Sequence, residues 1–250
     1  MTIAVGIDIG GTGIKGALVD LATGELRSER VKRSTPAGGA PDAIIETATD
    51  ILAELDAPAG APVGVCFPAI VLAGRTMSAA NVSDEWIGLE AEALFEASLG
   101  RDIHFVNDAD AAGVAEARYG AAVGRRGLVI MTTLGTGIGS AFLFDGVLVP
   151  NTELGHLELD GADVETWASN GVREREDLSF EKWAARLQRF YAHVEFLFSP
   201  ELLIVGGGVS KHHEQFLPLL ALRTPIVPAA LRNNAGIMGA AALAHRPEHI

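Results

Sequence analysis

The sequence predicts an α/β protein of two domains, and three observations support that prediction. Stretches with strand periodicity alternate with stretches of helical periodicity along 250 residues, a length that suits two modest domains. The motif Gly-Thr-Gly-Ile occurs at 11–14 and again at 135–138, each time between two strand-like stretches. Apolar residues make up 48% of the chain, which is enough for a substantial core. Because the repeat period is half the chain, it indicates a duplicated domain rather than a solenoid.

The first half of the chain begins with strands and continues with a helix and a further strand. Strand patterns at 3–9 and 14–20 are joined by the first glycine turn, and a third strand is expected over 25–35. Apolar residues spaced three and four apart predict an amphipathic helix over 41–55. Residues 62–72 return to the pattern of a buried strand.

The second half is expected to repeat this alternation of strands and helices. Apolar runs predict strands at 103–106, 127–134, 140–149 and 202–205. Helical spacing and small residues predict helices at 108–119, 179–198 and 236–245. We expect an N-terminal domain over 1–107 and a larger C-terminal domain over 108–250. The last helix, near 235–245, is a candidate to pack back on the first domain.

Charge and hydropathy exclude two broad classes of function. A net charge of −13 does not suit a nucleic-acid-binding protein that relies on a broad basic surface. No apolar run is long enough to span a bilayer, and the first residues enter a strand pattern without the features of a signal peptide. The single cysteine, Cys66, lies in an apolar run and is expected to be a buried, reduced core residue. We expect a cytoplasmic protein with neither a membrane nor a nucleic acid as partner.

The two glycine turns have the composition of phosphate-binding loops. Glycine lets backbone N–H groups approach a phosphate closely, and threonine adds a hydroxyl donor. The first turn is flanked by Asp8, which could orient a Mg²⁺ ion through water, and by Lys15, which could meet a phosphoryl oxygen. An ordinary hairpin turn is the alternative interpretation, and the matching second copy favours phosphate.

A third glycine cluster at 205–211 follows a buried strand and precedes a predicted helix. This order is common in nucleotide-binding loops, but the cluster is neither a GxGxxG motif nor a P-loop, so the signal is weak. Together the three loops supply the candidate phosphate-binding residues: Asp8, Gly10, Gly11, Thr12, Gly13, Lys15, Thr133, Gly135, Thr136, Gly137, Gly207, Gly208 and Lys211.

A candidate general base lies at the start of the helix predicted after residue 107. Asp108 stands between a strand end and a helix start, where its carboxylate could face a cleft and accept a proton from an attacking hydroxyl. Aspartate is also a common helix N-cap, and Asp110 is a rival for the same role. The residues alone leave these alternatives open.

At five segments the sequence resembles the ROK family of sugar kinases and, within it, the polyphosphate glucokinases. The segments follow the family's order over nearly the full chain: DIGGTGIK at 8–15, NDADAAG at 107–113, TTLGTGIGSA at 132–141, ELGH at 153–156 and IVGGGVSK at 204–211. The Ser-Ala ending of the third segment and the stretches 193–200 and 222–228 are similar to the polyphosphate-using branch.

The resemblance implies a fold of two ribonuclease-H-like domains, as in actin-like ATPases and hexokinases, with mixed sheets around a central cleft. It implies phosphorylation of the 6-hydroxyl of glucose, with mannose as a further candidate acceptor. Inorganic polyphosphate and ATP are the candidate donors, with Mg²⁺. A strictly ATP-dependent hexose kinase and a non-catalytic, sugar-responsive regulator are the alternatives. The resemblance to the family also suggests that the protein forms a homodimer.

The family's site residues map onto matching positions of this chain. The resemblance assigns Asp108 as the general base, in preference to Asp110. It implies a set of residues that bind the sugar substrate: Asn81, Asn107, Asp108, Glu153, His156 and Glu165.

Two departures from the family pattern carry expectations of their own. ROK kinases usually have a cysteine-rich zinc motif before the position of Glu165, whereas this chain has Gly-Ala-Asp-Val at 161–164. We therefore expect no structural zinc, with His156 oriented by packing and hydrogen bonds. Ala69 also stands where the family tends to have glycine, which puts the backbone conformation near the sugar in question.

A long polyanion such as polyphosphate is expected to bind along a row of positively charged side chains. Candidate cations are Arg118, Arg125 and Arg126 before the second glycine turn, with Lys15 and Lys211 at the other loops. An ordinary solvated face is the alternative interpretation of the arginines.

Overall fold

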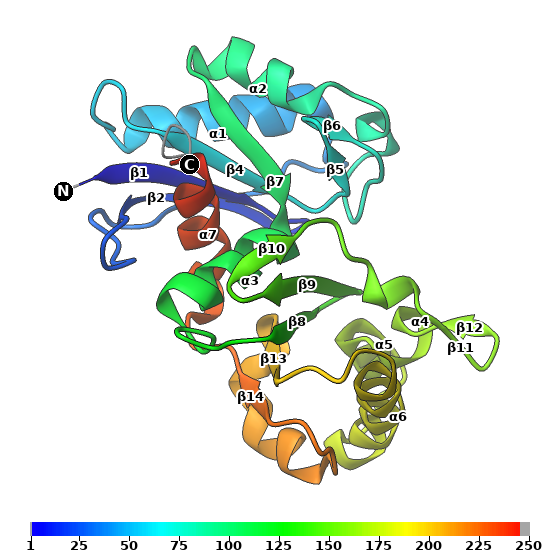
Figure 1. The fold of residues 1–250 in the computed structure, drawn as a ribbon. Coiled ribbons are helices and arrows are strands. Elements are labelled where there is room, and N and C mark those ends of the chain that lie inside the picture. Colours follow the sequence, from blue (N-terminus) through cyan, green and yellow to red (C-terminus); the bar gives the residue numbers. More distant parts are fainter. Residues whose placement is uncertain (1, 246–250) are drawn as a thin grey trace. The chain divides into compact units, whose positions relative to one another are not determined.

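The computed structural model describes residues 2–245, and the chain divides into two compact units. Unit 1 comprises the chain up to Ala115 together with the segment from Asn234 onward, and unit 2 is Glu116–Asn233. The chain therefore passes from one unit to the other within helix α3 (Asp108–Tyr119) and just before helix α7 (Ala235–Ala244). Figure 1 labels these elements.

Unit 1 contains a mixed five-stranded sheet of order β3-β2-β1-β4-β7. β1, β2 and β3 pair antiparallel, whereas β1, β4 and β7 pair parallel. The strands are β1 (Ile3–Ile9), β2 (Gly13–Asp20), β3 (Val31–Ser34), β4 (Val63–Phe67) and β7 (Ile103–Asn107). A separate small hairpin joins β5 (Val71–Leu72) to β6 (Arg75–Thr76).

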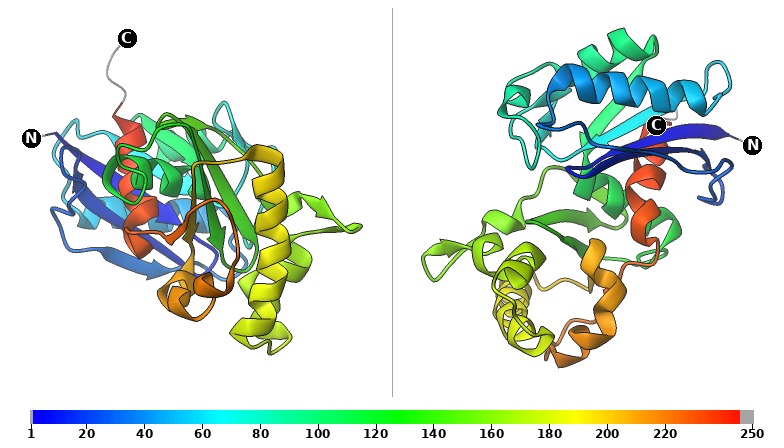
Figure 2. Two further views of the ribbon diagram at one scale, coloured as in Figure 1. Left: turned by 60° about the horizontal axis from the view of Figure 1, so that its bottom comes forward. Right: turned by 180° about the vertical axis from the view of Figure 1, so that it is seen from behind.

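Helices cover both faces of this sheet. Helices α1 (Pro41–Glu54) and α2 (Ala91–Leu99) lie on one face, and α7 lies on the other (Figures 1 and 2). α7 packs directly on the backbone of β1, since a Cβ atom on Gly6 would lie 1.9 Å from the carbonyl oxygen of Ile237. Glycine at this strand position is therefore required by helix–sheet contact.

Unit 2 repeats the arrangement, with a mixed sheet of order β10-β9-β8-β13-β14. The first three strands pair antiparallel and β8, β13 and β14 pair parallel, as in unit 1. The strands are β8 (Leu128–Leu134), β9 (Ile138–Phe144), β10 (Val147–Val149), β13 (Leu202–Gly206) and β14 (Ile226–Pro228). The duplication predicted from the glycine motif and the mixed sheets implied by the resemblance are confirmed.

Helix α6 (Phe180–Phe198) contributes six buried residues to the core of unit 2. Trp183, Leu187, Phe190 and Val194 recur at three- and four-residue spacing and are fully buried. The helix begins where the side chain of Ser179 accepts a hydrogen bond from Lys182 N–H. Two short helices, α4 (Glu165–Ala168) and α5 (Asn170–Arg175), precede it, and the hairpin of β11 (Glu158–Leu159) and β12 (Ala162–Asp163) precedes them.

Four element predictions differ from the structure. The strand expected over 62–72 ends at Phe67, and Val71–Leu72 pairs in a separate hairpin. The strand expected over 25–35 forms only as β3, because the preceding turn is held by an ion pair between Arg27 and Asp20. The strand expected over 140–149 is divided by a turn at Asp145, where φ is positive. The helix expected after the third glycine cluster is a 3₁₀ segment, Gly208–Gln215, with a kink at His212. Within the described residues, no helix has the length and apolar character needed to cross a membrane.

Candidate active site

The first glycine turn closes the β1–β2 hairpin of unit 1. Gly10 N–H donates to the carbonyl oxygen of Gly13 across the turn, at 3.0 Å. Asp8 and Lys15 are direct cross-strand partners, and Lys15 Nζ lies 2.9 Å from Asp8 Oδ2. The side chain of Asp8 is 15% exposed and that of Lys15 is 24% exposed. The structure therefore brings the predicted carboxylate and the predicted ammonium together as one partly buried ion pair.

Asn81 lies against this turn. A Cβ atom on Gly11 would lie only 2.7 Å from Cβ of Asn81. Asn81 can therefore pack this closely only because residue 11 has no side chain. Asn81 adopts a positive φ of 62°, a conformation that asparagine tolerates better than most residues. A residue assigned to the sugar and a residue assigned to phosphate are thus neighbours within unit 1.

Asp8 and Asp108 lie near the same edge of the unit 1 sheet. Asp8 pairs in register with Cys66 on β4, and Asp108 directly follows β7 on the other side of β4. Burial raises the pKa of the Cys66 thiol well above its ordinary value, and the charges of Asp8 and Asp108 add to that increase. Both carboxylates therefore flank Cys66 at the carboxyl ends of parallel strands, which is where open α/β sheets bind ligands.

Asn107, rather than Asp108, caps helix α3. The Oδ1 atom of Asn107 accepts a hydrogen bond from Asp110 N–H at 3.0 Å, three residues into the helix. Asp108 Oδ1 accepts from Ala109 N–H, and its side chain is only partly buried. Asp110 is 1% exposed, so of the two aspartates only Asp108 is open to solvent. Asn107 Nδ2 also donates to the carbonyl oxygen of Ala69, at 3.0 Å, which fixes the backbone where the chain departs from the family pattern.

The second glycine turn holds the carboxylate of Glu165 in unit 2. Ile138 N–H donates to Glu165 Oε2 at 3.2 Å. A Cβ atom would lie 2.5 Å from Oε2 if placed on Gly137 and 3.1 Å from it if placed on Gly155. The glycines of the turn and of the Glu-Leu-Gly-His motif therefore make room for the same carboxylate.

Glu153, His156 and Glu165 interact electrostatically in unit 2. His156 Nδ1 lies 3.0 Å from Oδ2 of Asp163, and this hydrogen bond raises the pKa of the imidazole. Partial burial opposes that shift, and the charges of Glu165 and Glu153 add to it. Burial also raises the pKa of the Glu153 carboxyl, against the lowering effect of His156. The three predicted residues thus form one cluster of hydrogen-bonding groups.

The third glycine loop packs on the second turn. Gly207 has a φ of 81°, and a Cβ atom there would lie 2.3 Å from the carbonyl oxygen of Leu134. A pocket of about 300 Å³ opens beside this contact. Four predicted phosphate residues line it, namely Gly135, Thr136, Gly208 and Lys211. Pattern reasoning missed other lining residues, among them Asn170, Arg173 and Glu174, because the segment 170–175 carries no recognisable motif.

Comparisons with known proteins decide the family. The ROK family model matches residues 4–174. Over 237 residues, the chain is 46% identical to the polyphosphate glucokinase of Mycobacterium tuberculosis (strain H37Rv), covering 94% of this chain and 89% of the relative. This chain belongs to the ROK family.

Solved structures of ROK proteins agree with the assignment. The inorganic polyphosphate/ATP-glucomannokinase of Arthrobacter sp. strain KM superimposes with a TM-score of 0.94 at 57% identity, covering 98% of both chains. A ROK family glucokinase from Streptomyces griseus, solved with glucose and AMPPNP, has a TM-score of 0.82 at 24% identity. It covers 96% of this chain and 98% of the other, and at that identity it supports the fold alone. The resemblance to the ROK family is confirmed.

In this ROK chain the segment that replaces the usual cysteine motif supplies the partner of His156. Asp163 belongs to residues 161–164, and its carboxylate forms the hydrogen bond to His156 that was expected to orient the imidazole. Among the described residues, no group of three His, Cys, Asp or Glu side chains is placed to hold a metal ion. Arg125 and Arg126 are exposed and do not line the pocket beside Gly207.

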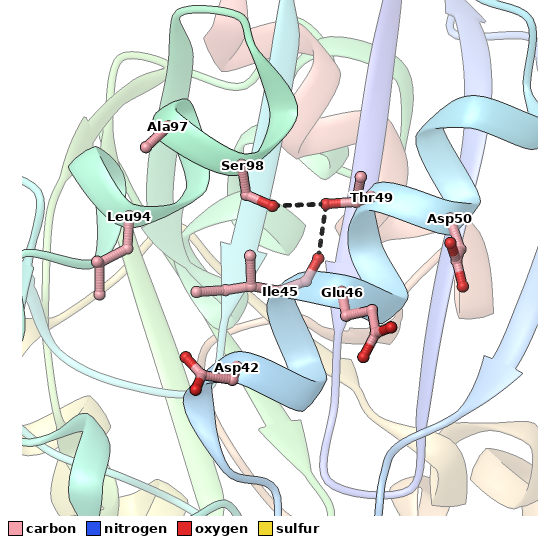
Figure 3. Close-up of a pocket in the computed structure, with 8 residues that line it drawn as sticks. All are labelled: Asp42, Ile45, Glu46, Thr49, Asp50, Leu94, Ala97 and Ser98. Carbon is pink, nitrogen blue, oxygen red and sulfur yellow. Dashed lines mark hydrogen bonds between the residues drawn. The ribbon is translucent and has the colours of Figure 1, made fainter.

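A second pocket of the ROK chain involves none of the predicted residues. It lies between α1 and α2 in unit 1, and its volume is about 480 Å³ (Figure 3). Asp42, Glu46 and Asp50 line it at four-residue intervals along α1, and Thr49 Oγ1 lies 3.0 Å from Ser98 Oγ. These negative charges do not suit a phosphate donor.

Proposed function

We propose that this chain transfers a phosphoryl group from inorganic polyphosphate, and also from ATP, to the 6-hydroxyl of glucose, with mannose as a second acceptor. The observation that carries the proposal is the 57% identity, over 98% of both chains, to a polyphosphate/ATP-glucomannokinase. The 46% identity to a polyphosphate glucokinase supports it independently. At these identities, relatives commonly share their chemistry as well as their fold, whereas a shared fold alone would not suffice.

Asp108 is proposed as the general base. Its carboxylate is partly exposed at the carboxyl edge of the unit 1 sheet, and the cap formed by Asn107 holds the adjoining helix start in place. It would take the proton of the sugar 6-hydroxyl as that oxygen forms a bond to the donor's terminal phosphorus. The bond from phosphorus to the bridging oxygen breaks, and the shortened donor leaves with the electron pair.

Glu153, His156 and Glu165 are proposed to bind sugar hydroxyls. The imidazole of His156 can donate a hydrogen bond, and ionised carboxylates accept them. Such a mixture discriminates among sugars because a wrong isomer leaves a polar group without a partner. Asn81 and Asn107 remain proposed ligands of the same sugar.

The glycine turns are proposed to bind the donor phosphates. In unit 1 the loop residues are Gly10, Gly11, Thr12 and Gly13, and in unit 2 the pocket beside Gly207 presents backbone and Lys211. Mg²⁺ would be carried by the donor phosphates, and the Asp8 carboxylate could orient it through water. Bound there, Mg²⁺ would neutralise phosphate charge.

Steady-state kinetics of the purified chain test the proposal. Glucose and mannose are each combined with polyphosphate and with ATP in the presence of Mg²⁺, and the sugar 6-phosphate that forms is measured by ³¹P NMR. 6-Deoxyglucose, which lacks the acceptor hydroxyl, serves as the negative control. Turnover with ATP alone would replace the proposal by an ATP-dependent hexose kinase. Absence of turnover with every donor would favour a non-catalytic regulator.

A further inference from the structure

The first glycine turn has two backbone donors without a protein acceptor. Within residues 2–245, neither Gly11 N–H nor Thr12 N–H donates a hydrogen bond to another protein group, and both residues are exposed. The neighbouring Gly10 N–H, by contrast, is bonded to the carbonyl oxygen of Gly13. Exposed N–H groups at successive positions can donate to the oxygens of one phosphate, so their direction decides how well the turn binds it.

Thr35 fixes the peptide group that carries the first of these donors. It directly follows β3, and its hydroxyl donates a hydrogen bond to the carbonyl oxygen of Gly10. A second contact, from Thr35 N–H to the carbonyl oxygen of Thr12, is longer, at 3.5 Å. Because the peptide bond is planar and trans, the N–H of Gly11 points to the side opposite the Gly10 carbonyl, and therefore away from Thr35. One hydroxyl group, from a residue 25 positions along the chain, thus sets the direction of Gly11 N–H.

The segment that begins with Thr35 is anchored at its far end, Gly39. The carbonyl oxygen of Gly39 accepts hydrogen bonds from the indole N–H of Trp86 at 2.9 Å and from Ser83 N–H at 3.2 Å. Trp86 is fully buried in the core of unit 1. Gly39 has a positive φ of 61°, and a Cβ atom there would lie 2.9 Å from Cα of Val82, so the contact requires glycine. The threonine is therefore held by β3 on one side and by this anchor on the other.

We propose that Thr35 is a positioning residue, which holds the first glycine turn so that Gly11 N–H donates to a phosphate oxygen of the phosphoryl donor. This inference rests on the proposed function, because it assumes that the turn binds the donor. Thr35 acts through the Gly10 carbonyl and contacts no substrate itself. A peptide group that already has its binding orientation avoids the free-energy cost of ordering when the donor arrives. Polyphosphate and ATP both present phosphate oxygens, so both donors depend on Thr35.

The test compares Thr35→Val with Thr47→Val. Valine keeps the shape of threonine and removes the hydroxyl. Thr47 is the matched control, because its partly buried hydroxyl also donates to a backbone carbonyl, that of Ala43 at 2.7 Å within helix α1. Thr35→Ser keeps the hydroxyl and is the rescue variant. For each variant, kcat and KM are measured for polyphosphate, ATP and glucose, and thermal unfolding is followed. In the wild-type chain, tripolyphosphate is titrated while the backbone amide NMR resonances, that of Gly11 among them, are recorded.

We expect Thr35→Val to lower kcat/KM for polyphosphate and for ATP alike by roughly 5- to 30-fold, because a hydrogen bond to a charged oxygen is weakened. The KM for glucose should change by less than about twofold, since the acceptor does not bind to this peptide group. Thr35→Ser recovers most of the loss, and Thr47→Val keeps the wild-type kinetics. The two valine variants lose similar thermal stability, so the kinetic difference between them reports on positioning. The Gly11 amide resonance shifts when tripolyphosphate is added to the wild type.

Three results overturn the inference while the proposed function stands. They are wild-type kinetics in Thr35→Val, the same kinetic loss in Thr47→Val, and a loss that Thr35→Ser does not recover. A titration with tripolyphosphate that shifts other amide resonances but not that of Gly11 also overturns it, and this result is decisive even if Thr35→Val does not fold. A wild-type chain that neither phosphorylates a sugar nor responds to tripolyphosphate overturns both the inference and the proposed function.

Discussion

Leu231 N–H donates a hydrogen bond to Oε1 of Glu116, 2.8 Å away, although the two residues are 115 positions apart in the chain. The other carboxylate oxygen, Oε2, accepts from Ala121 N–H at 2.7 Å. Glu116 is fully buried and is the first residue of unit 2, and Leu231 lies near the end of that unit. One carboxylate therefore ties together the segments by which the chain enters and leaves unit 2.

Replacing Glu116 by glutamine is expected to destabilise the protein. The new amide group would turn a donor toward one of two partly buried N–H groups, leaving that group without its acceptor at a cost of about 1–3 kcal/mol in the free energy of unfolding. Urea unfolding measures the loss. Glu214→Gln, on an exposed carboxylate, is the control and should stay within about 0.5 kcal/mol of the wild type. Equal stabilities of the two variants would contradict a structural role for Glu116.

Asp108→Asn is expected to lower kcat by about two to four powers of ten while the KM for glucose changes little. The amide keeps the shape of the side chain but cannot accept the proton of the sugar hydroxyl. Asp110→Asn is the matched variant, since Asp110 is buried and lies two residues along the same helix. It should alter thermal stability more than turnover. A larger loss of kcat in Asp110→Asn would transfer the role of base to that residue.

Asp163→Asn is expected to lower the pKa of His156, because the hydrogen bond to Asp163 is the main cause that raises it. A histidine whose folded pKa lies above its unfolded value stabilises the protein below the unfolded pKa, about 6.5, and this contribution disappears as pH rises through the folded pKa. The stability difference between wild type and variant should therefore be greatest in mild acid and vanish in alkali. NMR titration of the imidazole measures the pKa directly. An unchanged pKa of His156 would show that its shift has another origin.

Local sequence patterns predicted the parts of the site that lie within one hairpin. Glycines spaced between two apolar strands specify the turns at Gly10 and Gly135 through adjacent residues, so both turns could be predicted, and their binding of phosphate stays a prediction. Resemblance to the ROK family pointed to Glu165, and the structure places it against Gly137.

Residues whose role depends on distant contacts could not be predicted in the same way. Arg173 becomes a pocket residue only because the loop at Gly208 folds against Leu134, and no spacing in the sequence signals that contact. The expected helix after Gly207 forms only as a 3₁₀ segment with a kink at His212, which the local sequence pattern does not signal. Closure of the two units around a shared cleft stays a prediction.

Gly137→Ala is expected to raise the KM for glucose more than that for the donor. The added Cβ would lie 2.5 Å from Oε2 of Glu165, and the flexible carboxylate can move away from it at modest cost in stability. Gly135→Ala is the contrast, because a Cβ atom there meets nothing within 4 Å and leaves Glu165 in place. Kinetics with glucose as the varied substrate compare the two. If both variants have the wild-type KM for glucose, Glu165 does not hold the sugar.

Replacing Arg125 and Arg126 together by glutamine is expected to weaken the use of long polyphosphate more than the use of ATP. Both side chains are exposed and lie outside the pocket that contains Arg173, so they can reach only a donor that extends beyond it. Exposed charges act over about 10 Å at moderate ionic strength, so the effect should shrink as salt is added. Tripolyphosphate, too short to leave the pocket, should be used as well by the double variant as by the wild type. The measurement is kcat/KM for long polyphosphate, tripolyphosphate and ATP at two salt concentrations. If the two arginines do not contact the polyanion and are only solvated surface residues, the double variant will use all three donors as well as the wild type does.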